Sequence, residues 1–91
     1  MYDHYLVETY WNYGESSRSK IRARPLPGQG VSPSLKVECS RAMRNGYPVG
    51  TIFKIRAKIA YQGATAYLST HYTWPFEVLS REKARKYLKG R

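Results

Sequence analysis

The residues of this sequence best suited to chemistry are cations that recur at every second position. One triplet is Lys20, Arg22 and Arg24, and the other is Lys54, Arg56 and Lys58. Successive side chains of a β-strand point to opposite faces, so each triplet would lie on one face of a strand. Placed side by side, with Lys36 as an extension, the two triplets would form a basic sheet surface that neutralises phosphate groups.

An aromatic ring and a histidine fall near the second triplet in this arrangement. Residues 64–73 should pair back on the strand that holds this triplet, and Leu68 belongs to one of their two faces. If that face turns toward the core, Tyr67 and His71 point the same way as the triplet. A tyrosine ring offers a base a stacking platform worth about 1–3 kcal/mol.

These residues predict a nucleic-acid-binding module that contacts mainly the phosphate backbone of DNA or RNA. Binding of this kind has weak sequence specificity and a steep dependence on salt. The predicted contact residues are Lys20, Arg22, Arg24, Lys36, Lys54, Arg56, Lys58, Tyr67 and His71.

Other interpretations of the basic residues remain open. Cations on an exposed strand face also keep that face solvated and discourage pairing between sheet edges. The loop with Gly28 and Gly30 could bring backbone N–H groups to a phosphate, although it matches no nucleotide-binding motif and such a loop is more often a rigid connector. Arg41 and Arg44 could line one rim of the surface.

The sequence carries little that indicates catalysis. Two histidines, a single cysteine and few acids form no metal-ligand spacing, no carboxylate pair and no nucleophile motif, so we expect no metal and no cofactor. One enzymatic alternative is a small toxin-like ribonuclease that would use His71, Tyr67 and Arg56 on a phosphodiester. A further alternative is an adaptor that binds an acidic protein through the same basic face.

The charge is large and unevenly distributed. The net charge is +10, yet residues 1–17 contain three acidic residues and no lysine or arginine. All 16 basic residues therefore lie in residues 18–91. Because so positive a body repels itself, an anionic partner is favoured.

Alternation of polar and apolar residues predicts the secondary structure. The expected strands cover residues 4–11, 20–26, 34–40, 51–61 and 64–73, and residues 74–79, which begin with a break at Pro75, could form a short final strand. The segment 51–61 has the clearest pattern, with Phe53, Ile55, Ala57, Ile59 and Tyr61 on one face. Prolines and glycines make residues 25–33 a loop, and residues 41–46 fit either one helical turn or a turn after a strand.

The C-terminal segment is expected to be a basic helix. Ser80 is a suitable N-cap for a helix that ends near Lys89, and Glu82 and Lys86 have the i,i+4 spacing of a helical ion pair. Short strands followed by one helix predict a mostly β fold, a small SH3-like or OB-like barrel of five to six antiparallel strands.

The length of the chain and its single cysteine indicate the number of domains and the cellular environment. Ninety-one residues predict one domain, residues 1–91, with an acidic aromatic N-terminal strand and turn over 1–17 and a basic helix over 80–90. The lone Cys39 is expected to be buried, and a lone thiol indicates the reducing cytoplasm. The first 17 residues contain no lysine, no arginine and no apolar run, so we expect no signal peptide. No apolar stretch is long enough to span a bilayer, and the basic helix has too small an apolar face to insert, so we expect no membrane partner.

Overall fold

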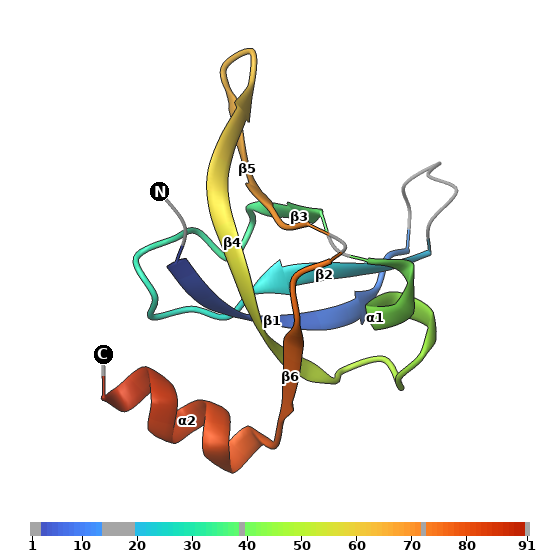
Figure 1. The fold of residues 1–91 in the computed structure, drawn as a ribbon, viewed down its shortest axis with the longest axis vertical. Coiled ribbons are helices and arrows are strands. Elements are labelled where there is room, and N and C mark those ends of the chain that lie inside the picture. Colours follow the sequence, from blue (N-terminus) through green and yellow to red (C-terminus); the bar gives the residue numbers. More distant parts are fainter. Residues whose placement is uncertain (1–2, 14–19, 39, 72, 91) are drawn as a thin grey trace.

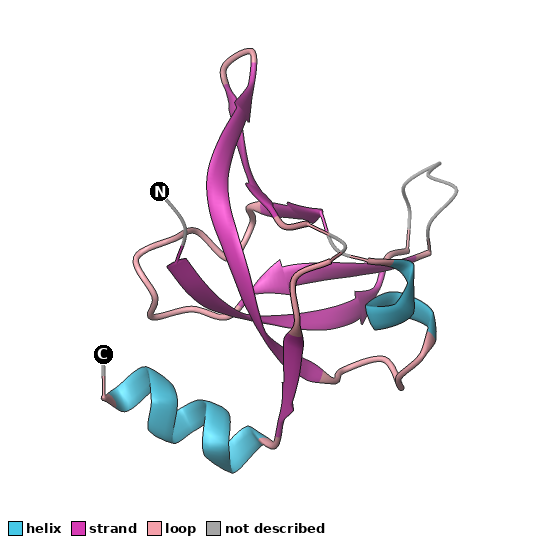
Figure 2. Cartoon of the chain, in the orientation of Figure 1, coloured by secondary structure: helices cyan, strands magenta, loops and turns pink. Residues whose placement is uncertain are grey.

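The computed structural model describes residues 3–13, 20–38, 40–71 and 73–90 (Figure 1). The elements are β1 (Asp3–Trp11), β2 (Ile21–Pro25), β3 (Lys36–Glu38), α1 (Arg41–Asn45), β4 (Ile52–Gln62), β5 (Thr65–Ser69), β6 (Phe76–Leu79) and α2 (Arg81–Lys89). Strands dominate, and the two helices lie at the periphery (Figure 2). The prediction of a mostly β fold with a C-terminal helix is confirmed. The ambiguous segment 41–46 forms the short helix α1. The predicted burial of Cys39 falls outside the described residues.

The strands form a nearly closed, five-stranded mixed barrel. Their order is β2-β1-β4-β5-β3, and β6 pairs with β4 beside this path. The terminal strands of the path, β2 and β3, approach each other and bring the sheet close to a ring. The sequence predicted a barrel of antiparallel strands, and this is wrong for one pair, because β3 and β5 run parallel. Between β3 and β5 the chain forms α1 and β4. It thereby returns to the end of the barrel at which β3 starts, so that β5 can run parallel to β3.

β4 is the central strand of the barrel and pairs with β1, β5 and β6. Its first half, from Ile52 to Ala57, pairs with β1, and Ile52–Ile55 also pair with β6 on the other edge. Its second half, from Lys58 to Gln62, pairs with β5. One strand therefore belongs to two neighbouring parts of the sheet.

The core face predicted for β4 is correct only for the half inside the barrel. Phe53, Ile55 and Ala57 are buried in the main core. Ile59 and Tyr61 were expected on the same buried face, but they are 42% and 70% exposed. The reason is visible in Figure 1, where the β4–β5 hairpin extends beyond the other strands, so that no second layer covers its end.

Two clusters of apolar side chains hold the fold together. The main core lies inside the barrel, where Phe53 and Phe76 meet edge to face with ring centroids 5.4 Å apart. The second cluster joins α2 to the outer face of the sheet through Leu6, Ile52, Leu79 and Ala84. Its helix begins as predicted, because the Ser80 hydroxyl accepts a hydrogen bond from the Lys83 backbone N–H at 3.1 Å.

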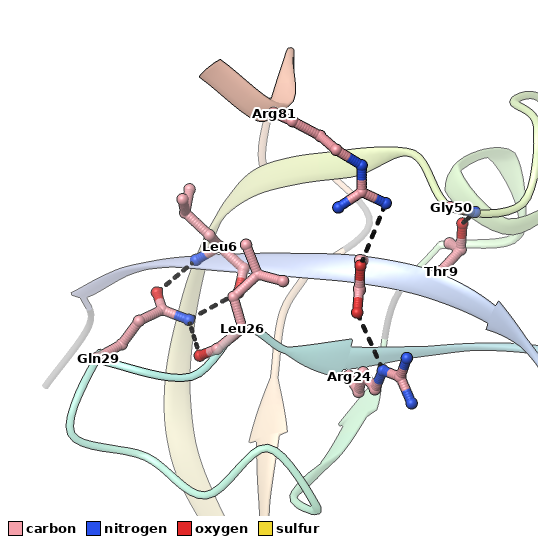
Figure 3. A network of polar contacts seen from close by, with 8 residues as sticks. Leu6, Thr9, Arg24, Leu26, Gln29, Gly50 and Arg81 are labelled. Carbon is pink, nitrogen blue, oxygen red and sulfur yellow. Dashed lines mark hydrogen bonds and ion pairs between the residues drawn. The ribbon is translucent and has the colours of Figure 1, made fainter. Parts of the chain in front are cut away.

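The loop between β2 and β3 is fastened to β1 by one buried side chain, Gln29 (Figure 3). Its Oε1 accepts a hydrogen bond from the Leu6 backbone N–H at 2.7 Å. Its Nε2 donates to the carbonyl oxygens of Leu6 and Leu26, both at 2.8 Å. The flanking Gly28 and Gly30 have φ of 91° and 78°, which turn this side chain inward. These contacts show the loop acting as a connector in the barrel.

Replacement of Gln29 by alanine should destabilise the fold by about 2–4 kcal/mol. The Leu6 N–H and the Leu26 carbonyl would lose their side-chain partner, and each buried unpaired group costs roughly 1–3 kcal/mol. Urea unfolding of Gln29→Ala measures the loss. Gln62→Ala is the matched control, because Gln62 is exposed on β4, and its effect should stay within about 0.5 kcal/mol. Equal stabilities of the two variants would contradict this role of Gln29.

Candidate nucleic-acid interface

A groove follows the open seam of the barrel, where β2 faces β3. Two adjoining hollows share Arg22, Ala23, Lys36 and Val37 at this place, and the larger has a volume of about 810 Å³. We name the combined hollow the seam groove. The cationic, aromatic and histidine side chains that line it and that matter below are Arg22, Arg24, Lys36, Arg44, Tyr67 and His71.

The strand pairing of β1 and β2 sets the direction of the Ala23 backbone groups at the seam. The Thr9 N–H donates to the Thr51 carbonyl at 3.2 Å, and the Gly50 N–H donates to the Thr9 carbonyl at 3.0 Å. Both backbone groups of Thr9 thus point toward the start of β4. Ala23 is the residue opposite Thr9 on β2, so its own N–H and C=O point away from β1 and into the seam groove. Ala23 itself is only 4% exposed, so these groups lie beneath the surface of the groove.

β2 supplies two of the predicted cations to this wall. Arg22 lines both hollows. The Arg24 Nε lies 3.1 Å from Oε1 of Glu8, and its guanidinium stacks 4.7 Å from the centre of the Tyr10 ring. The Arg24 side chain remains 49% exposed despite this pairing, so it can still meet a ligand. Lys20 precedes β2, is exposed and does not line the groove.

The opposite wall comes from β3 and β5. Lys36 is the register neighbour of Tyr67 on the adjacent strand. Leu68 is fully buried, so Tyr67 points to the outer face, which is also the face of Lys58 because Lys58 pairs with Ser69. The expected orientation of Leu68 inward and Tyr67 outward is thus what the structure has.

His71 enters the same groove from the chain that follows β5. Its Nδ1 is 2.6 Å from the Thr73 hydroxyl oxygen, and the Thr73 backbone N–H donates to Nδ1 at 3.2 Å. Because a backbone N–H can only donate, Nδ1 must supply a lone pair. In the neutral ring the proton then resides on Nε2. His71 is therefore a hydrogen-bond donor at this atom, as a phosphate or a base acceptor requires.

The second basic triplet does not line the groove. The Lys54 Nζ is 4.8 Å from the centre of the Tyr87 ring of α2, and the Arg56 guanidinium is 5.2 Å from that of Trp74. Lys58 is exposed beside Ser69. β1 separates β2 from β4, and α2 packs over β1 and β4. The two triplets therefore do not form one continuous surface, although both point outward.

Two charged residues that line the groove, Arg44 and Glu38, were not among the predicted contacts. Arg44 lines the groove from α1, whose Met43 is buried against the core. Sequence placed Arg44 only at an uncertain rim, because a five-residue helix has no clear periodicity. Glu38 lines the groove two positions after Lys36. The period-two spacing that selected the cations would have found Glu38 as well, had acids been included.

Glu8 links Arg24 of β2 to Arg81 of α2, and its carboxylate is the unlabelled group between these two side chains in Figure 3. Its carboxylate contacts Arg24 at 3.1 Å and, through its other oxygen, Arg81 at 3.9 Å. Arg81 belongs to the first turn of α2. Glu8 thus pairs with a cation of the groove, Arg24, and with a cation of α2, Arg81.

Comparison with known proteins supplies no family for this arrangement. No family model matches the chain, and no curated protein or solved structure matches it significantly. In the described ranges, no three of the histidine, cysteine and acidic side chains cluster as metal ligands would. No helix among these residues has the length and apolar character to cross a membrane.

The proton position on His71 can be tested directly. In the neutral form of the ring we expect the Nε2–H tautomer, since the Thr73 N–H occupies Nδ1. A two-dimensional ¹⁵N–¹H correlation spectrum of the imidazole nitrogens distinguishes the two tautomers. Observation of a proton on Nδ1 in the neutral ring would contradict this assignment of the tautomer.

Proposed function

We propose that this protein binds nucleic acid in the seam groove, mainly through phosphate contacts. The observation that carries the proposal is the convergence of Arg22, Lys36 and Arg44 from three different elements on one groove. Tyr67 and His71 lie among them. Cations neutralise phosphates and the tyrosine ring can stack on a base, which are the two components of sequence-tolerant binding.

The overall charge supports a polyanionic partner. The chain carries a net charge of +10, and the groove gathers four cations against one acid, Glu38. A bound polyanion would relieve the repulsion among these cations. Each phosphate that they neutralise releases counterions, so binding should weaken as salt increases.

The architecture supports the same site. Small, partly open five-stranded barrels of the OB kind bind oligonucleotides across their second and third strands and the loops beside them. The seam groove crosses β2 and β3 and reaches the β4–β5 hairpin through Gln62 and Thr65. Architecture alone does not define function, and the proposal therefore depends on the groove side chains rather than on this likeness.

The test compares two double variants with the same loss of charge. Arg22→Gln/Lys36→Gln removes two cations from the groove, and Lys83→Gln/Arg85→Gln removes two exposed cations from α2. Fluorescence anisotropy with labelled RNA, single-stranded DNA and duplex DNA measures affinity at several salt concentrations. We expect the groove variant to bind about tenfold or more weakly. Its slope of log K against log[salt] should be shallower by about 1.4 for single strands or 1.8 for duplex.

The α2 variant should bind nearly as tightly as the unmodified protein, because surface charges far from the ligand are screened over about 8 Å at physiological salt. An equal loss in both variants would place binding outside the groove. Weakening by Arg56→Gln/Lys58→Gln, with the groove variant unaffected, would assign it to the second triplet. Absence of binding at low salt would overturn the proposal. Cleavage of the bound RNA would support the ribonuclease alternative instead.

A further inference from the structure

Glu38 is out of place in a groove that only binds phosphate. It is exposed on the outer face of β3, where it pairs in register with Ser69, next to the pair formed by Lys36 and Tyr67. In the part of the chain that the structure describes, its carboxylate forms neither an ion pair nor a hydrogen bond. Its carboxylate therefore faces the groove and would repel a phosphate placed beside it.

A carboxylate can only accept hydrogen bonds, and it has two oxygens side by side. It is therefore suited to a ligand edge with two adjacent donors. Among the nucleobases, the Watson–Crick edge of guanine has such a pair, N1–H and the N2 amino group. The same edges of uracil, adenine and cytosine each place at least one acceptor beside a single donor, and that acceptor would face a carboxylate oxygen.

The groove has the other features that a guanine base needs. Tyr67 lies on the outer face beside Lys36, and Glu38 lies about 7 Å further along β3. That separation is similar to the length of a purine ring system, so a base stacked on the ring of Tyr67 can direct its edge toward Glu38. The larger hollow, about 810 Å³, is in the size range of pockets that hold compact organic ligands. A duplex hides the Watson–Crick edge, whereas an unpaired base exposes it.

We propose that the seam groove takes single-stranded nucleic acid and that Glu38 selects an unpaired guanine stacked on Tyr67. This inference rests on the proposed function and adds to it a base preference and a strand preference. The guanine edge is the same in RNA and DNA, so the chemistry is shared between the two.

The test uses a short labelled oligouridine with one central guanosine and its all-uridine parent. The unmodified protein should bind the guanosine oligonucleotide at least about tenfold more tightly. Inosine lacks the N2 amino group and should lose most of this preference, whereas 7-deazaguanosine, which retains the Watson–Crick edge, should keep it. Annealing to a complementary strand should abolish it. Deoxyribose oligonucleotides, thymidine replacing uridine, show whether the natural ligand class is RNA or DNA.

Glu38→Gln should change the two affinities in opposite directions. The guanosine oligonucleotide should bind more weakly, because one carboxylate oxygen becomes an amide that donates. The all-uridine oligonucleotide should bind somewhat more tightly, because a negative charge is lost near the phosphates. Glu77→Gln, an exposed acid on β6, is the charge-matched control and should leave the preference unchanged. Thermal unfolding of each variant verifies that the barrel is intact.

The outcomes separate this inference from the proposed function. Salt-dependent binding of both oligonucleotides without a guanine preference would overturn the inference alone. A preference that survives Glu38→Gln would overturn it too, because another group would then read the base. If neither oligonucleotide binds at low salt, the inference and the proposed function fail together.

Discussion

The structure depends on the continuity of β4 from Ile52 to Gln62. Its first half is held between β1 and β6, and its second half pairs with β5. Because the strand is uninterrupted, the position of β5 is fixed relative to β1, and β5 in turn fixes β3. The two ends of the sheet meet at a seam as a result, with α2 packed over β1, β4 and β6 instead. The groove and the helix thus occupy different parts of the barrel's outer surface. The first half of β4 packs against α2, and its second half pairs with β5 beside the groove.

Local pattern predicted the strands and α2 approximately, left α1 open, and did not predict which elements are neighbours. Alternation identified the strands and the inward position of Leu68, and the Ser80 cap marked the start of α2. Alternation does not state which strands pair, so nothing in it placed β1 between the two basic triplets. The exposure of Tyr61 was missed for a related reason: its strand keeps an apolar period beyond the point where the barrel covers it. The candidate site was therefore half predicted, as five of its six named side chains were expected but their meeting place was not.

Two polar side chains, Gln29 and Glu8, connect β1 to parts of the chain outside the strand pairing. Gln29 completes the pairing beside Leu6, where β2 has ended at Pro25 and the Leu26 N–H still donates to the Leu6 carbonyl at 3.0 Å. Glu8 links the end of the sheet to the first turn of α2 through Arg24 and Arg81. An exposed ion pair contributes little, about 0–1 kcal/mol, whereas the Gln29 amide satisfies both backbone groups of the buried Leu6. We therefore attribute the geometry of the loop to Gln29 and regard Glu8 mainly as a means of orienting Arg24.

The parallel pairing of β3 with β5 also bears on how the chain folds. Lys36 meets Tyr67 only after α1 and the whole of β4 have been made and positioned. Contacts between residues so distant in sequence carry a large loop-closure entropy, and folds rich in them form slowly. The three-residue β3 has little pairing energy of its own with which to offset that cost. The last step of folding should then be the docking of β3. During synthesis, β1 would leave the ribosome well before its partner β4, so the barrel could form only after β4 and β5 have been made.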